Sequence, residues 1–477
     1  MLMLASMALD KKRIDGLFER QRAHRKVMRL TTSAERIEKL NRLKTAIEET
    51  KEDLYQALYE DYRKPKTEAD LTEVVISISE INYMVRNLAK FMRPVSVESP
   101  ISLIGARSEL RYEPRGSSLI IAPWNYPMQL SIVPLIGAIA AGNTAILKPS
   151  EYTPSTSAYL ASLLGNNFPE EEVAVVEGEV DASSYLLEKP FDHIFFTGSP
   201  EIGKVVMAAG AKHLAAVTLE LGGKCPAIID ESADIRDAAR KITWGKYQNC
   251  GQTCIAPDYV FVPESKKELF ISHVRSTLDD FYGEEKNRDK TPDFARIVST
   301  RHWKRLVGMV ESAVKDGAKV EIGGQSIEAE NYLAPTVMTN VPVDSKLMQE
   351  EIFGPVMPIL TYNDIDEVID FVSDRPNPLA LYVFSTQPRV TEKVIQGTAA
   401  GGTCVNDVLI HYLNNSLPFG GSGNSGLGNY HGFYSFRAFS HERSVVHQST
   451  MVPVSQMVYP PYGGMREVLT GFLKPFF

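Results

Sequence analysis

Apolar residues recur at helical spacing in two charged stretches near the start of the chain, at 40–54 and 71–81. Charged residues occupy the positions between them, so each stretch would bury one face and expose the other. The pattern predicts two or three amphipathic helices within residues 10–93, which Pro94 and Pro100 bring to an end.

The period changes after residue 116, where short apolar runs alternate with helical stretches. This alternation is typical of parallel β-sheets that helices cover on both faces. It occurs twice, so the sequence predicts an α/β fold with two doubly wound parallel-sheet domains. The predicted strands are 118–122, 144–148, 173–177, 193–196 and 215–221 in the first domain, and 226–230, 259–262, 356–362, 380–385 and 403–406 in the second. The predicted helices are 134–142, 153–164 and 201–211, followed by 234–244, 264–282 and 301–317.

A small β arm is predicted outside the two sheets. Residues 102–114 alternate loosely and end in a Pro-Arg-Gly turn, as a hairpin would, and 436–448 is predicted as one more strand beside it. Residues 414–432 are rich in Gly, Asn and Ser and predict a loop. The expected division is a first sheet domain of residues 1–97 and 116–220, a second of 221–412, an arm of 98–115 and 413–460, and a tail of 461–477.

Charge and composition exclude several classes of protein. The 477 residues include 51 Lys and Arg against 59 Asp and Glu, a net charge of −8, so a basic footprint for nucleic acid is absent. A run of about 18 apolar residues is also absent, and we expect no spanning helix. The apolar residues 1–9 precede their positive charges, so we expect a frayed terminus and not a secretory signal. The apolar end, 471–477, is expected to dock on the protein surface.

The four cysteines are Cys225, Cys250, Cys254 and Cys404. They are too few for a disulfide scaffold, and they form no Cys-x-x-Cys pair and stand beside no His cluster, so no metal site is expected. Free thiols suit a reducing compartment, which predicts a cytoplasmic protein.

The strongest local signal for chemistry is the segment 249–260. Cys254 follows a predicted helix and precedes Pro257 at the entrance to a strand, where its thiolate could act as a nucleophile. The alternative is a buried cysteine that only fills space. The preceding helix would point its negative end toward Cys254, so activation has to come from elsewhere, and a carboxylate acting through water is expected.

Two further residues suit such chemistry. Glu220 ends an apolar strand next to Gly222 and Gly223, where a charge is costly unless it is paired or functional. The glycines would permit close approach of a flat ligand. Asn125 stands between two prolines after a strand, and its amide could donate to a developing oxyanion. The alternative for Glu220 is an ion pair at the rim of the sheet, and the alternative for Asn125 is an ordinary structural role in a turn.

Two strand-to-helix junctions have features of nucleotide sites. Gly198 frees the turn before a helix whose first N–H groups suit a phosphate, although Gly203 lies too far on for the dinucleotide fingerprint. Lys148 and Glu151 follow another strand and suit ribose hydroxyls. The alternative at Gly198 is an ordinary strand-to-helix turn, and the alternative for Lys148 and Glu151 is an incidental charge pair on a solvated loop.

Two other glycine-containing segments have opposite interpretations. Glu351 could accept from ribose hydroxyls and Phe353 could wall an aromatic ring, with an exposed acidic turn as the alternative. The formal G-x-G-x-x-G match at 421–426 follows no predicted strand, so we expect a surface loop there and not a cofactor loop.

Taken in order, the motifs PWNYP, FTGS, LELGGK, GQTC, EEIFGP and LPFGG resemble the aldehyde dehydrogenase superfamily over nearly the whole chain. The segments 405–408, 417–432 and 435–441 resemble its class 3 branch, which includes fatty and aromatic aldehyde dehydrogenases. Phe433 departs from the Lys that is common there in relatives. The hydrophobic tail of the membrane-bound members is longer than this one.

The resemblance implies a role for each motif. Cys254 would be the nucleophile, Asn125 the oxyanion donor and Glu220 the general base, its pKa raised by burial. The first sheet domain would be a Rossmann-like cofactor domain, and the second would be catalytic. The cofactor would be NAD, with NADP also accommodated, and the chain would form a homodimer through the arm. The cofactor contacts implied are Trp124, Lys148, Glu151, Gly198, Ser199, Gly203, Leu221, Gly222, Glu351 and Phe353.

The activity expected from the resemblance is NAD(P)-dependent oxidation of a medium-chain, long-chain or aromatic aldehyde to its acid, through a cysteine thiohemiacetal and a thioester. One alternative is transfer of the acyl group to coenzyme A, against which Glu220 argues because a thiol acceptor needs no water-activating carboxylate. The other is a scaffold that keeps the fold without catalysis, against which the intact Cys254, Glu220 and Asn125 argue.

Overall fold

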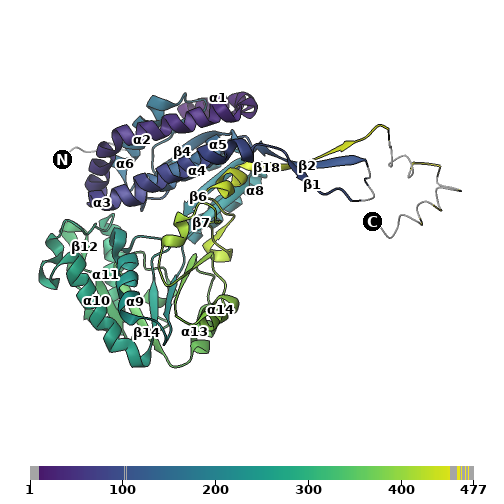
Figure 1. Cartoon of the computed structure of the whole chain (residues 1–477). Helices are drawn as coiled ribbons and strands as arrows, with labels where there is room; N and C mark the ends of the chain where they lie inside the picture. The colour runs from purple at the N-terminus through teal and green to yellow at the C-terminus, as the bar shows by residue number, and fades with distance from the viewer. Residues whose placement is uncertain are drawn as a thin grey trace.

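A computed structural model shows two α/β lobes and one projecting arm (Figure 1). It describes residues 10–100, 103, 105–451, 459–461, 464, 468 and 471. The predicted frayed terminus lies outside the described residues, as does the predicted docked end apart from Gly471. Within the described part of the chain, no helix combines the length and apolar character needed to cross a membrane.

The predicted N-terminal helices are confirmed. They pack their apolar stripes onto the first lobe, and Leu40, Leu43, Ile47 and Leu54 are fully buried. A capping box starts the longest helix, because the Thr32 hydroxyl accepts from the Glu35 N–H and the Glu35 carboxylate accepts from the Thr32 N–H. The elements are α1 (Lys11–Leu30), α2 (Ser33–Tyr62), α3 (Lys66–Ala69), the π-helical turn η1 (Asp70–Val74) and α4 (Val75–Phe91).

The first sheet has the order β17-β7-β6-β3-β4-β5, and it is parallel apart from β17. Its two faces are both covered: Ile120 belongs to one buried cluster, while Leu119 and Ile121 belong to the other. The strands are β3 (Ser117–Ile121), β4 (Thr144–Lys148), β5 (Val173–Val175), β6 (His193–Gly198), β7 (Ala216–Leu221) and β17 (Gly426–Leu427). The helices are α5 (Gln129–Ala141), α6 (Pro154–Asn167), α7 (Val180–Leu187) and α8 (Pro200–His213).

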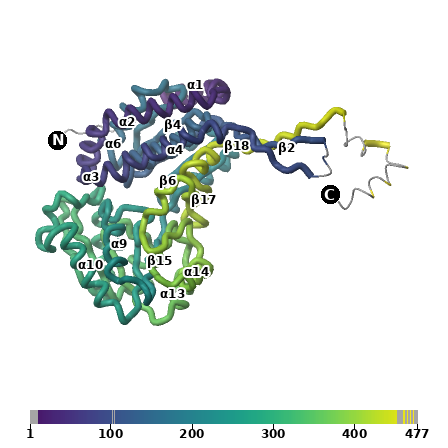
Figure 2. Tube along the Cα trace, viewed as in Figure 1, coloured from purple at the N-terminus to yellow at the C-terminus, as the bar shows by residue number. Residues whose placement is uncertain are grey.

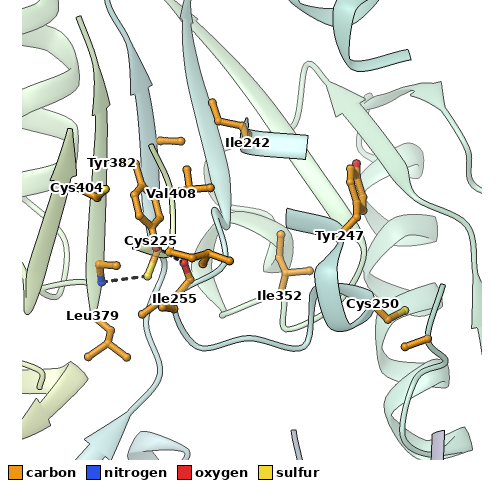
Figure 3. Packing of buried hydrophobic residues seen from close by; sticks show 14 of the residues in the cluster. Cys225, Ile242, Tyr247, Cys250, Ile255, Ile352, Leu379, Tyr382, Cys404 and Val408 are labelled. Atoms are coloured by element: carbon orange, nitrogen blue, oxygen red, sulfur yellow. Dashed lines mark hydrogen bonds between the residues drawn. The ribbon is translucent and has the colours of Figure 1, made fainter. Parts of the chain in front are cut away.

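The second sheet has the order β10-β13-β14-β9-β8-β15-β16, and only β10 runs antiparallel to its neighbour. Figure 3 shows buried side chains of this lobe, with Tyr382 beside Cys225. The strands are β8 (Pro226–Ile229), β9 (Tyr259–Pro263), β10 (Lys319–Ile322), β13 (Thr336–Thr339), β14 (Val356–Tyr362), β15 (Ala380–Phe384) and β16 (Gly402–Val405). The helices are α9 (Ile235–Tyr247), α10 (Lys267–Tyr282), α11 (Thr300–Lys315), α12 (Lys346–Gln349), α13 (Ile365–Ser373) and α14 (Pro388–Gly397), with a small hairpin of β11 (Ser326–Ile327) and β12 (Tyr332–Leu333).

The arm is a three-stranded antiparallel sheet of β1 (Val95–Val97), β2 (Ala106–Pro114) and β18 (Ser440–Gln448). Figure 2 shows β18 in yellow alongside β2, far along the chain but adjacent in space. The predicted hairpin and its third strand are therefore confirmed in outline.

Two predictions about the C-terminal region were wrong in part. The expected strand 436–448 begins with helix α15 (Phe433–Ala438), and a Cβ on Gly137 of α5 would lie 2.9 Å from the Cβ of Ser435. The missing side chain at Gly137 is what lets the two helices meet. The expected surface loop at 421–426 ends in β17, which pairs with β7. Both elements therefore belong to the first lobe although they fall in the range predicted for the arm.

Candidate active site

A cavity of about 730 Å³ lies between the two lobes. The carboxyl ends of β3, β6 and β7 open onto it from the first sheet, as do the amino ends of β8, β9 and β15 from the second. Carboxyl ends of parallel strands are the usual ligand edge of such sheets. The cavity is lined by most of the predicted site residues: Trp124, Asn125, Gly198, Ser199, Glu220, Leu221, Gly222, Cys254, Glu351 and Phe353.

The loop that leads to Cys254 has an unusual backbone. Asn249, Cys250 and Gly251 all adopt left-handed conformations, with φ of 54°, 56° and 73°. For a residue such as Cys250 this costs about 1–2 kcal/mol, so the surroundings have to hold it. A Cβ on Gly251 would lie 2.3 Å from the carbonyl oxygen of Gly354, and glycine is therefore required there.

The Gln252 side chain fixes this loop. Its amide nitrogen donates to the carbonyl oxygens of Asn249 at 3.1 Å and Arg296 at 3.0 Å, and its amide oxygen accepts from the Val298 N–H at 3.0 Å. Gln252 is fully buried, so these bonds have no competition from water. The loop is held in one shape, which offsets the strain of its left-handed residues.

Asn125 is tied to the same loop. The side-chain nitrogen of Asn125 donates to the backbone carbonyl oxygen of Gln252 at 3.1 Å. The backbone carbonyl oxygen of Asn125 accepts from the side-chain amide of Asn249 at 2.8 Å. An amide nitrogen carries two hydrogens, so one donor remains beyond the bond to Gln252. The geometry fixes that donor relative to the loop that carries Cys254.

Glu220 lies near the end of β7, where it pairs with Thr197 of β6 and Gly426 of β17. It is only 3% exposed, and neither carboxylate oxygen has a hydrogen-bond partner among the described residues. Burial raises the pKa of Glu220 well above its usual range, as the sequence predicted. A buried carboxyl group without a partner is costly, which favours a functional role over a structural one.

Cys254 is a half-buried residue that lines the cavity. Burial raises the pKa of Cys254, and the charges of Glu351 and Glu220 raise it further. The Cys225 thiol donates to the Cys254 carbonyl oxygen at 3.4 Å and accepts from the Ala380 N–H at 3.3 Å (Figure 3 shows Cys225). The backbone of Cys254 is therefore held in place, but no neighbouring cation lowers the pKa of its thiol.

An aromatic group forms one wall of the cavity. The rings of Trp124 and Phe353 meet edge to face at 5.1 Å, and Trp124 meets the His302 ring at 4.9 Å. The hydroxyl of Ser299 lies 2.7 Å from Nδ1 of His302, and burial lowers the pKa of His302 to about 4. His302 is therefore neutral at pH 7. Sequence reasoning missed it because it lies within an amphipathic helix, where a lone His gives no signal.

Glu351 fills the space next to Gly222. A Cβ on Gly222 would lie 1.8 Å from a Glu351 carboxylate oxygen, so the glycine makes room for this side chain at the cavity wall. Burial raises the pKa of Glu351 to about 8, and the charge of Asp258 adds to the rise. One carboxylate oxygen of Glu351 has no hydrogen-bond partner among the described residues.

Three predicted contact residues lie outside the cavity lining. Lys148, which is 2% exposed, and Glu151 form an ion pair of 3.0 Å at the end of β4. Gly203 lies in α8, where a Cβ would meet the Leu221 side chain at 2.7 Å. Gly203 therefore allows close packing of α8 on β7. The hydroxyl of Ser199, the residue before α8, caps the helix by accepting from the Ile202 N–H.

Another part of the cavity wall is apolar and was not predicted from the sequence. Its residues come from segments far apart in the chain, so no local pattern connects them. They include Leu130, Leu409, Tyr412, Phe419 and Tyr430.

Comparison with known proteins agrees with this geometry. The model of the aldehyde dehydrogenase family matches residues 3–445. The chain is 45% identical to the 4,4'-diaponeurosporen-aldehyde dehydrogenase of Staphylococcus aureus, over 92% of this chain and 94% of the relative. It is 43% identical to aldehyde dehydrogenase family 3 member A2 of Rattus norvegicus, over 89% of this chain and 87% of the relative, which confirms the predicted class 3 resemblance.

Solved structures give the same result. The substrate-bound state of Staphylococcus aureus AldH superposes with a TM-score of 0.92 at 43% identity, and the alignment covers 96% of this chain and 99% of that one. The NAD⁺ complex of the aldehyde dehydrogenase of Bacillus cereus has a TM-score of 0.84 at 30% identity, with coverage of 92% and 89%. The chain therefore belongs to the aldehyde dehydrogenase family and is an oxidoreductase that acts on the aldehyde group.

Proposed function

We propose that this chain oxidises a medium-chain, long-chain or aromatic aldehyde to its carboxylic acid, with NAD as the hydride acceptor and NADP as a weaker one. The observation that carries this proposal is the meeting of Cys254, Asn125 and Glu220 at one cavity. The apolar part of the wall supports an apolar aldehyde, because only such a substrate gains by burial there.

The residues suggest the following sequence of events. The Cys254 thiolate attacks the aldehyde carbon, and the resulting oxyanion of the thiohemiacetal accepts a hydrogen bond from the Asn125 amide. The bound cofactor would supply the acceptor for the hydride that leaves this carbon, so that a thioester on Cys254 remains. Glu220 then takes a proton from water, the hydroxide adds to the thioester, and the acid and the free thiolate are released.

The site fits a dinucleotide. The aromatic wall of Trp124 and Phe353 offers a face for a flat ring, and the unpartnered oxygen of Glu351 offers an acceptor for a ribose hydroxyl. The start of α8, which Ser199 caps, offers N–H groups to a phosphate. The NAD⁺ complex of the Bacillus cereus relative supports this assignment.

Cofactor choice is expected to depend on Glu151. Its carboxylate would repel the 2′-phosphate of NADP, so kcat/KM should favour NAD, and Glu151→Gln should bring the two values closer together. A panel of aldehydes of increasing chain length, run with both cofactors, measures this ratio and the substrate class together. A preference for NADP in the unaltered enzyme would contradict the role given to Glu151, and inactivity toward all apolar aldehydes would overturn the proposed function.

Removal of the oxyanion donor should slow catalysis strongly. We expect Asn125→Ala to lower kcat by about 10²–10³-fold, which corresponds to about 2.7–4 kcal/mol of lost transition-state stabilisation. Steady-state rates of nicotinamide reduction measure the effect, and Asn166→Ala on the surface of α6 serves as the control. A loss below about tenfold would show that another group holds the oxyanion.

The chain is also proposed to form a homodimer. Val95, Val97 and Val446 of the predicted dimerisation arm are 45%, 47% and 53% exposed, and Val97 and Val446 flank Ser108 of β2 on either side. We expect the wild type to sediment as a dimer and a Val97→Asp, Val446→Asp variant as a monomer, because both carboxylates would be buried unpaired. Val314→Asp, at an equally exposed valine of α11, is the control. A monomeric wild type would refute the dimer.

The four cysteines form no disulfide in the structure. Free thiols persist in a reducing compartment, which supports a cytoplasmic location. Fractionation of the host cell, followed by immunodetection of the chain, tests this location.

A further inference from the structure

Three charged side chains surround the loop that carries Glu351, and we call them the clamp: Lys224, Asp258 and Arg305. They come from three separate places, the connection between β7 and β8, the residue before β9, and helix α11. None of them is assigned a part in the chemistry described above. Their contacts converge on one short stretch of backbone.

Arg305 and Asp258 hold the residues at and after Glu351. The Arg305 guanidinium donates to the carbonyl oxygen of Glu351 at 3.2 Å and to that of Ile352. The Asp258 carboxylate accepts from the Ile352 N–H at 3.2 Å. Both are charge-assisted hydrogen bonds, which are stronger than bonds between neutral groups.

Lys224 holds the residue before Glu351. Its ammonium donates to the Glu350 carbonyl oxygen at 2.9 Å and forms an ion pair with Asp258. The side chains of Lys224 and Asp258 are 12% and 4% exposed, so water competes little with either contact. The ammonium of Lys246, which is fully buried, lies 3.7 Å from Asp258 and offsets its charge from the other side.

The clamp therefore fixes the backbone immediately before, at and after Glu351. The side chain in the middle has a different environment, because one of its carboxylate oxygens is buried without a partner. A buried acceptor left open next to a cavity points to a ligand donor that completes it. Because the backbone is fixed on both sides, the open Glu351 oxygen keeps one position. Less conformational entropy is then lost when a ligand binds to it.

We propose that the clamp is a positioning device that holds the Glu351 carboxylate ready for a ribose hydroxyl of the cofactor. This inference rests on the proposed use of NAD(P). It assigns no direct contact with the cofactor to Arg305, whose effect is transmitted through the backbone of Glu351 and Ile352.

The first test is cofactor affinity in the absence of aldehyde. Arg305→Met removes both guanidinium contacts, and we expect the Kd for NAD to rise by about tenfold, as the loss of charge-assisted bonds implies. Arg305→Lys, whose ammonium reaches one carbonyl oxygen at most, should lie between this variant and the wild type. The control is Lys304→Met, on the same helix as Arg305, which removes an exposed ion pair with Glu328 and should leave the Kd unchanged.

The second test separates positioning from direct contact. If Arg305 acts through Glu351, its removal should matter little once the carboxylate is gone. We expect the double variant of Arg305→Met and Glu351→Gln to bind NAD within about threefold of Glu351→Gln alone. A further tenfold loss in the double variant would mean that Arg305 touches the cofactor or acts elsewhere, and would overturn the proposal.

Two readouts guard against a merely structural effect. The far-ultraviolet and near-ultraviolet circular dichroism spectra should match those of the wild type, because the variants are expected to move one carboxylate and to leave the fold intact. If Arg305→Met does not fold, Lys224→Met carries the same test through Glu350. A wild type that binds neither NAD nor NADP would defeat the proposed function itself, whereas binding that the clamp variants leave unchanged would defeat the clamp alone.

Discussion

Cys254→Ser should abolish aldehyde oxidation while cofactor binding persists. A serine hydroxyl loses its proton far less readily than a thiol, and nothing near residue 254 compensates, since the neighbouring Glu351 and Glu220 charges oppose ionisation. We expect kcat to fall by at least about 10³-fold. Absorbance of the reduced nicotinamide measures the loss, and calorimetric titration with NAD measures the affinity that remains.

A matched control comes from a cysteine outside the cavity. Cys404 lies in β16 and is 7% exposed, and Cys404→Ala should retain nearly full activity because no reacting atom touches it. Near-wild-type turnover by Cys254→Ser would show that another group attacks the aldehyde. Equal losses in both variants would point to damage of the fold and not of the chemistry.

Glu220→Gln should arrest the reaction at the thioester intermediate. Once the Cys254 thiolate has formed, attack and hydride removal need no base at residue 220, so the first turnover should still produce reduced nicotinamide in an amount close to that of the enzyme. Hydrolysis of the thioester needs the carboxylate, and the loss of a general base typically costs about 10²–10⁴-fold. Stopped-flow absorbance should therefore show a burst followed by a very slow steady state. A low rate without any burst would give Glu220 a different part in the reaction.

The pH dependence follows from the same residue. Burial raises the pKa of Glu220, and only the ionised carboxylate can act as a base. Deacylation in the wild type should accelerate as pH rises and the carboxyl group loses its proton. The residual deacylation in Glu220→Gln should lack this rise, because the amide does not titrate.

Local pattern was enough to predict much of the fold. The predicted strand 144–148 has the same bounds as β4, because a short apolar run between turn residues is distinctive. Helix α5 begins at Gln129, before the predicted start at residue 134, because its whole circumference is buried and it has no polar face to mark its extent. Strands β10 and β13 were missed, since each is only four residues long and carries charged or polar positions.

Site residues could be predicted where they belong to one contiguous motif. Contacts between segments that only folding brings together could not be predicted. Cys254, Glu220 and Asn125 stand out beside glycines and prolines, and the resemblance gave them roles. The strand pairing of Gly426 with Glu220 joins the C-terminal region to the middle of the chain, and no local sequence pattern predicts it. The contacts of Arg305 with the loop of Glu351 depend likewise on how a helix packs.

The measurement that most directly tests the central claim is mass spectrometry of Glu220→Gln quenched after mixing with NAD and an aldehyde. Proteolytic peptides should show the mass of the acyl group on the peptide that contains Cys254, and none on those that contain Cys225 or Cys404. An acyl group on any other residue, or no covalent adduct in a sample that has produced reduced nicotinamide, would contradict a reaction that passes through the Cys254 thioester.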